Sequence, residues 1–125
     1  MMDQPSATEI LTAVREFIDK HAIPALSGRT AFHARVASNA LSIVLRELEL
    51  GPDSARRELE GLKSLLGTSG TLEELNRELC RRIRAGAIDP LDPALGHHLV
   101  QTTLSKVEID QPGYSGFVHS PHRTA

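Results

Sequence analysis

Hydrophobic residues recur at the spacing of an α-helix along almost the whole chain. The first such segment opens with Ser6 and Glu9, which have the spacing of a capping box, and Pro24 is expected to end it. Between them lies one apolar stripe, made of Ile10, Val14, Phe17 and Ile18. The pattern predicts a first helix with one apolar face.

The segment from Pro24 to Leu50 predicts a second helix, from about Thr30 to Leu50, with Gly51-Pro52 as its end. Drawn at 100° per residue, this helix carries apolar residues on two sides. One side holds Phe32, Val36 and Ile43, and the other holds Leu41, Val44, Leu45 and Leu48. A helix with one solvent-exposed face does not need this much apolar surface, so we expect other parts of the protein or a partner to pack on both sides.

Three further helices with clear end signals are predicted, over 53–67, 71–86 and about 93–109. No segment alternates with period two for long enough to be a strand. The sequence therefore predicts an all-α, single-domain bundle of about five helices over residues 6–110. An N-terminal tail (1–5) and a C-terminal tail (111–125) flank it.

Composition narrows the class of protein. The 125 residues fit one domain, and an aromatic content of 3% without Trp predicts an aliphatic core. A formal net charge of −2 argues against a dedicated nucleic-acid binder. The single cysteine, Cys80, excludes an intramolecular disulfide within this sequence. No run approaches 18 apolar residues and the start lacks a secretory signal, so we expect a cytoplasmic protein without a membrane span.

Two asparagines are set in apolar stripes, Asn39 in the second helix and Asn76 in the fourth. An unpaired buried amide costs on the order of 1–3 kcal/mol. We therefore expect both side chains to be buried and hydrogen-bonded inside the monomer. The alternative is that they face a ligand.

Arg29, His33 and Arg35 cluster at the start of the second helix, after a Ser-Gly turn. Guanidinium groups match carboxylates and phosphates with paired hydrogen bonds, which makes these residues candidate partner or ligand contacts. The alternative is that the arginines pair with acidic residues of the same chain, such as Glu47 or Glu74.

The C-terminal tail holds two of the four aromatic residues, Tyr114 and Phe117. Aromatic side chains act as anchors where they find a pocket, so we consider both as candidate contacts, either to this chain's own helices or to a partner. A frayed tail is the alternative.

Chemical motifs are scarce. The six histidines lack the spacing of a helical metal site, and we expect no metal, no cofactor and no catalytic residue. Cys80 is expected to act as a small hydrophobe within its helix. Around it lies a charged cluster, expected to be mostly solvated, whose positive patch offers a place for phosphates: Arg77, Glu78, Arg81, Arg82 and Arg84.

The blocks PSATEILTAVREFIDK, PALSGRTAFHARVASNALSIVLRELELG, LNRELCRRIRAG and DPLDPALGHHLVQTTLSKVEIDQPGYSGF resemble a bacterial family of small proteins of uncharacterised domain type. The resemblance covers residues 4 to 118, and its most specific part is SGRxAFHARVAxNAL with a downstream LNRELxxRIRxG. It implies genes beside an aminoglycoside-phosphotransferase-like kinase and an acyl-CoA dehydrogenase. In levulinate-type catabolism it implies an accessory subunit of the kinase that phosphorylates 4-hydroxyacyl-CoA.

The leading hypothesis is therefore a non-catalytic subunit that binds such a kinase. Two alternatives stay open: a self-contained helical module that binds a small molecule such as acyl-CoA in its core, and a homo-oligomeric structural domain. An accessory subunit is expected to expose an apolar patch when alone, whereas a ligand binder needs a cavity of roughly 300 Å³ or more.

Overall fold

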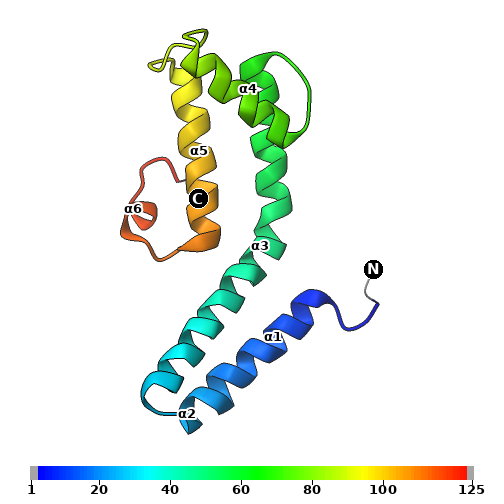
Figure 1. Ribbon diagram of the computed structural model, residues 1–125, viewed down its shortest axis with the longest axis vertical. Helices are drawn as coiled ribbons and strands as arrows, with labels where there is room; N and C mark the ends of the chain where they lie inside the picture. The colour runs from blue at the N-terminus through cyan, green and yellow to red at the C-terminus, as the bar shows by residue number, and fades with distance from the viewer. Residues whose placement is uncertain (1–2, 124–125) are drawn as a thin grey trace. The chain divides into compact units, whose positions relative to one another are not determined.

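The computed structural model describes residues 3–123, in which all regular structure is helical (Figure 1). The helices are α1 (Ala7–Phe17), α2 (Ile23–Ala25), α3 (Gly28–Leu66), α4 (Leu72–Arg84), α5 (Pro93–Asp110) and α6 (Ser115–Val118), and a π-helical turn, Ile18–Ala22, joins α1 to α2. The all-α prediction is confirmed. Within the described residues, none of the helices has both the length and the apolar character needed to cross a membrane.

The chain divides into two compact units, residues 1–50 and residues 51–125, and each is described by itself. Helix α3 contributes its first part to one unit and its second part to the other.

The predicted helix end at Gly51-Pro52 is wrong, because α3 continues through Pro52. A proline inside a helix removes one backbone hydrogen bond and costs about 3 kcal/mol relative to alanine, a cost that the flanking turns can offset. On the C-terminal side, Arg56 pairs with both Asp53 and Glu60, and Arg57 lies 3.5 Å from Asp53. Pairs at this spacing support the helix directly after the proline.

In the first unit, α1 and the first part of α3 lie side by side in opposite directions and form a helical hairpin (Figure 1). The buried residues of α3 in this unit are small, Ala31 and Ser38, and partly buried aliphatic side chains such as Leu41 and Leu45 lie beside them. The Ser38 hydroxyl donates to the Asp19 carboxylate at 2.5 Å, and Arg15 donates to the Ser42 hydroxyl at 3.4 Å. The hairpin is therefore joined by a close, partly polar contact.

Asn39 is exposed, so the prediction that it is buried is wrong. The side of α3 that faces α1 is the one with Ala31 and Ser38, and the stripe that holds Asn39 lies elsewhere on the helix. Phe32 and Val36 of that stripe are 59% and 49% exposed. The sequence pattern located an apolar side of the helix but not the side that the hairpin buries.

The second unit has a leucine core where the second part of α3 meets α4 and α5. Its buried members are Leu62, Leu66, Leu75, Leu79 and Leu95. The predicted capping box of α4 is present, with the Thr71 hydroxyl accepting from the Glu74 amide and the Glu74 carboxylate accepting from the Thr71 amide. Asp92 caps α5 by accepting from the Ala94 amide at 2.9 Å.

The C-terminal segment docks on its own unit, as expected if its aromatic residues anchor it to this chain's own helices. Phe117 of α6 is 4% exposed, and the Arg123 guanidinium lies 4.6 Å from the centre of its ring. Gln101 of α5 donates to the backbone carbonyl of His122 at 3.1 Å. Phe117 is therefore an internal anchor and not an exposed partner contact, whereas Tyr114 stays exposed. Residues 124 and 125 of the predicted tail lie outside the described residues.

Replacing Pro52 by alanine tests whether α3 is continuous. Alanine restores a backbone donor to the helix interior, so we expect the free energy of unfolding in urea to rise by on the order of 2 kcal/mol. The matched control is Pro93→Ala at the first turn of α5, where proline is well tolerated and no gain is expected. An equal, near-zero change in both variants would contradict a helix that runs through residue 52.

Candidate functional site

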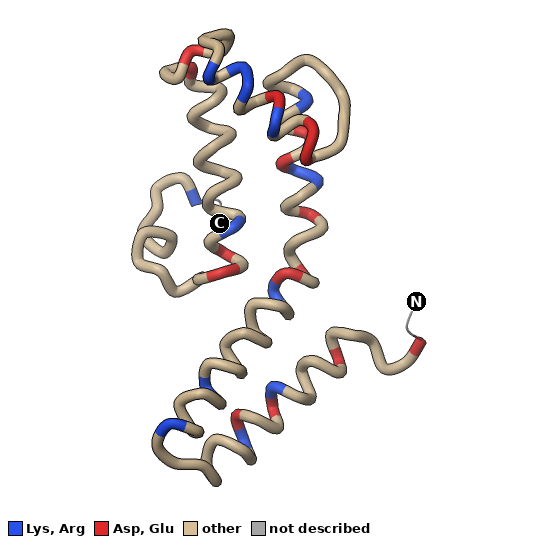
Figure 2. Tube along the Cα trace, in the orientation of Figure 1, with Lys and Arg blue, Asp and Glu red and all other residues tan. Residues whose placement is uncertain are grey.

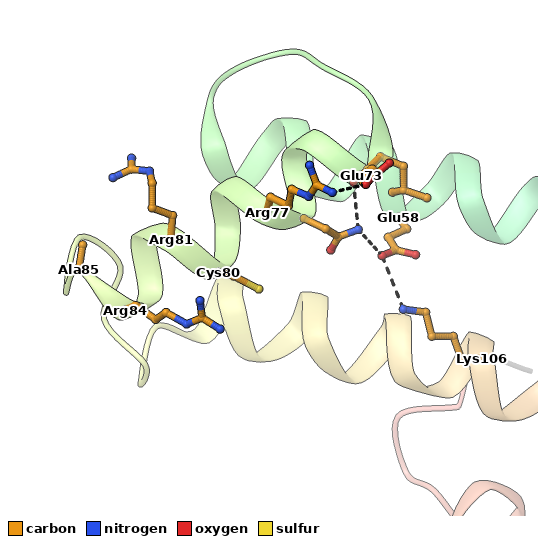
Figure 3. A pocket seen from close by; sticks show the side chains of 10 residues that line it. Glu58, Glu73, Arg77, Cys80, Arg81, Arg84, Ala85 and Lys106 are labelled. Atoms are coloured by element: carbon orange, nitrogen blue, oxygen red, sulfur yellow. Dashed lines mark hydrogen bonds and ion pairs between the residues drawn. The ribbon is translucent and has the colours of Figure 1, made fainter.

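A buried carboxylate joins three helices of the second unit. The side chain of Glu58, on α3, is only 9% exposed. It accepts a hydrogen bond from the Asn76 amide of α4 at 3.0 Å and lies 3.8 Å from the Lys106 ammonium of α5 (Figure 3). A buried charge is tolerated only where it is paired and hydrogen-bonded. This polar cluster therefore ties α3, α4 and α5 together at the edge of the leucine core.

The predicted hydrogen bonding of Asn76 is confirmed, although its side chain is half-buried rather than fully buried. It also donates to the Leu72 carbonyl, one turn earlier, at 3.1 Å. The sequence pattern did not identify Glu58 as the partner of Asn76. Its position one helical turn before Leu62, within the stripe that forms the core, could have indicated a partly buried carboxylate.

An open groove of about 1120 Å³ lies along one side of α4, between Glu58 and Lys106 at one end and Ala85 at the other (Figure 3). We call it the α4 groove. Leu72, Cys80 and Ala85 contribute apolar lining. Its cationic lining residues are Arg77, Arg81, Arg84 and Lys106, against two carboxylates, Glu58 and Glu73. The groove thus combines an apolar surface with an excess of positive charge, in a protein whose net charge is −2.

Most charges of α4 are paired along the helix itself, where basic and acidic residues alternate (Figure 2). Arg77 lies 2.5 Å from Glu73, and both Arg81 and Arg82 donate to Glu78 at 2.7 Å. These hydrogen bonds lower the pKa of Glu78 to about 2. Arg82 also donates to the Leu66 carbonyl at 2.8 Å, at the end of α3.

Arg84 differs from the other cations of the α4 groove. Lys106 is held by Glu58, Arg77 by Glu73 and Arg81 by Glu78, whereas Arg84 has no acidic partner within residues 3–123. In Figure 3 its side chain extends from α4 on the side that faces α5, as does that of Cys80. Its guanidinium is therefore available to a ligand.

Cys80 is exposed, which corrects the expectation of a small hydrophobe within the packed helix. Helix α4 buries Leu75 and Leu79 against the core, and Cys80 follows Leu79 by one residue, about 100° around the helix. The thiol therefore lies on the lining of the α4 groove instead of in the core.

A second cavity of about 750 Å³ lies in the same unit, between α3 and α5, and His98 lines it. Gly61 makes room for this side chain, because a β-carbon at residue 61 would lie 2.7 Å from His98 Nδ1. Burial lowers the pKa of His98, and the nearby Glu58 carboxylate opposes this effect. Among residues 3–123, no group of three or more His, Cys, Asp or Glu side chains is placed to hold a metal ion.

The predicted Arg29, His33 and Arg35 cluster lies on the first turns of α3, and all three residues are exposed. Arg29 and His33 are one turn apart on the same side, whereas Arg35 projects from a different side of the helix. The His33 ring packs edge-on against that of Phe32, with 5.6 Å between ring centres. Within residues 3–50, neither Arg29 nor Arg35 forms the alternative ion pair with Glu47.

Both helices of the hairpin expose large apolar side chains. On α1 these include Phe17, which is 61% exposed, together with Ile10 and Val14. On α3 they are Phe32, Val36, Val44 and Leu48. Few charges interrupt this part of α3 (Figure 2). Single exposed hydrophobic residues are common in monomers, but this number on one small unit favours an interaction role. The set covers more than one face, because Phe32 and Val36 lie on one side of α3 and Val44 and Leu48 on another. We call these seven residues the hairpin apolar set.

A family model described as "Domain of unknown function (DUF6285)" matches residues 24–114. The chain belongs to this family. The DUF6285 region includes Phe32 and Val36 of the hairpin, the Glu58–Asn76–Lys106 cluster and the whole α4 groove, and it leaves out α1 and Phe117. No curated protein and no solved structure matches the chain.

Replacing Asn76 by leucine tests the polar cluster. The change leaves the buried Glu58 carboxylate without its hydrogen-bond donor, so we expect the free energy of unfolding to fall by about 1–3 kcal/mol. The matched control is Asn39→Leu on exposed α3 surface, where a change within about 0.5 kcal/mol is expected. Chemical denaturation of both variants measures the difference, and equal losses would argue against a structural role of the cluster.

The environment of His98 predicts a pH dependence of stability. Because burial lowers the folded-state pKa below the usual 6.5, the unfolded chain binds the proton more tightly than the folded chain. Stability is therefore expected to fall as the pH drops below about 6.5. The free energy of unfolding is measured with denaturant between pH 8 and pH 5. His98→Gln is expected to reduce its fall with decreasing pH, whereas His97→Gln, which replaces an exposed side chain, is expected to leave that fall unchanged. Identical slopes in the two variants would contradict the assignment.

Proposed function

We propose that this DUF6285 protein is a non-catalytic accessory subunit of a phosphotransferase-like kinase that acts on hydroxyacyl-CoA. The structural support is the hairpin apolar set, which a partner protein would cover. The kind of partner is inferred from the resemblance of the SGRTAFHARVASNAL and LNRELCRRIRAG blocks to accessory proteins encoded beside such kinases.

The hairpin apolar set suits a protein partner better than a small ligand. Burying an exposed Phe or Val side chain is worth roughly 1.5–3 kcal/mol, and a stable interface buries about 800 Å² on each partner. Phe17 and Phe32 are both more than half exposed and are the largest side chains of the set. Aromatic residues in such positions carry much of the binding energy of protein interfaces.

The chemistry in such a complex would belong to the kinase. The kinase would supply ATP, magnesium and the catalytic base, while the accessory subunit would order a kinase loop or stabilise the kinase fold. Arg29 and His33, on the same side at the start of α3, provide exposed polar groups for the edge of the interface.

The proposal predicts that the kinase encoded beside this protein phosphorylates a 4-hydroxyacyl-CoA faster when the small protein is present, and that the small protein alone is inactive. Phe32→Ser is expected to weaken binding to the kinase about tenfold or more, because a buried aromatic contact is lost. Its thermal melt is expected to change little, because Phe32 is exposed in the monomer. Titration of kinase activity with the small protein measures the affinity.

The matched control is Leu91→Ser, which removes an 87% exposed leucine outside the hairpin and is expected to leave the titration unchanged. Arg29→Ala and His33→Ala are expected to weaken the effect on the kinase without lowering the melt. Equal kinase activity with and without the small protein would overturn the proposal. A stable homodimer that Phe32→Ser dissociates, with no effect on the kinase, would assign the hairpin apolar set to self-association.

A further inference from the structure

We infer that the α4 groove binds an amphipathic anion, a ligand with an aliphatic chain and a terminal carboxylate or phosphate. The chain would lie along Leu72, Cys80 and Ala85, and Arg84 would hold the anionic head. This inference is independent of the proposed kinase partner, because it concerns the second unit alone and needs no other protein.

The charge of the groove supports an anion. Its lining has four cationic side chains against two carboxylates, and both carboxylates are already engaged, Glu58 by Asn76 and Lys106 and Glu73 by Arg77. Arg84 alone among the four cations lacks an acidic partner within residues 3–123. A guanidinium with free donors binds one carboxylate or phosphate through paired hydrogen bonds, so Arg84 offers a binding position for one anion.

The apolar lining supports a thin chain rather than a partner helix. Among residues 3–123, none of the exposed large hydrophobic residues lines the α4 groove, and the apolar lining consists of a half-buried leucine, a cysteine and an alanine. A docking helix usually inserts several large side chains into deep apolar pockets. The volume of about 1120 Å³ slightly exceeds the roughly 300–1,000 Å³ of typical small-molecule sites, so the open groove has room for an extended chain.

The polar cluster at one end makes the groove a fixed structure. Glu58 is bonded to Asn76, on the same helix as Arg84, and ion-paired to Lys106 across the groove. Leu75 and Leu79 hold that helix against the core from the opposite side. The position of the α4 backbone at Arg84 relative to the apolar lining is therefore set before any ligand binds, which lowers the entropic cost of binding.

Cys80 provides a direct test, because it is the only cysteine and it lines the groove. The rate of its alkylation by iodoacetamide, an uncharged reagent, is measured on the protein alone with and without decyl phosphate or decanoate, below micelle-forming concentrations. We expect either anion to slow the alkylation several-fold. The relative protection by the two distinguishes a phosphate from a carboxylate ligand. Decanol and inorganic phosphate are expected to leave the rate unchanged.

Arg84→Gln is expected to weaken the protection by about tenfold in ligand affinity, since a charge-assisted hydrogen bond is lost. Arg84→Lys keeps the charge without the paired geometry and is expected to be intermediate. The matched control is Arg56→Gln, which replaces an exposed arginine outside the groove. In this variant the anions are expected to protect Cys80 from alkylation as strongly as in the unmodified protein. Each rate is compared with that of the same variant without ligand, so any change in the intrinsic reactivity of the thiol cancels.

Several results would overturn the inference. Equal protection by decanol would make the site merely apolar, and protection by inorganic phosphate alone would make it a phosphate site without a chain. An alkylation rate that no anion changes would mean that the groove does not bind such ligands. Protection by the kinase but by neither amphiphile would assign the groove to a protein interface. Because no kinase is present in the main experiment, a failure of the proposed function leaves its outcome unaffected.

Discussion

The burial of Leu62 is the contact on which the second unit depends. Its side chain has no exposed surface, and the four other buried leucines of the core surround it from α3, α4 and α5. With no Trp and few aromatic residues in the sequence, an aliphatic layer of this kind has to orient all three helices. Its geometry decides which polar residues meet. Glu58 lies one turn before Leu62, and Asn76 follows the buried Leu75, so the core itself brings the carboxylate and the amide together.

The hairpin obeys a different constraint. Its most buried residues on α3 are Ala31 and Ser38, and small side chains of this kind allow helices to approach closely. A hydrogen bond from Ser38 to Asp19 fixes the pairing. Several bulky apolar side chains stay exposed beside this contact, Phe17 on α1 and Phe32 on α3 among them. A two-helix unit has only one internal face, so its other apolar faces stay exposed within the unit.

Local signals were predictable from the sequence, and long-range ones were not. The capping box of α4 depends on residues three positions apart, so Thr71 and Glu74 identified the helix start correctly. Pro52 misled the prediction because the cost of one proline is offset by neighbouring turns. Asn39 misled it because an apolar stripe does not reveal which of two apolar sides a neighbour covers. The α4 groove depends on Glu58 and Lys106 meeting α4 in space, and no periodicity encodes that juxtaposition.

Local ion pairing explains how an acidic protein can present a specific anion site. Asp53, Glu73 and Glu78 each neutralise an arginine on their own helix, and such exposed pairs add little to stability. Their effect is instead to reduce the general positive field, so that non-specific attraction to polyanions is weak at a net charge of −2. Within residues 3–123, Arg84 has no acidic partner, and it lies beside the apolar lining of the α4 groove. Selectivity then comes from one placed guanidinium and the surface next to it, because only a ligand that offers both an anion and an apolar chain satisfies the two at once.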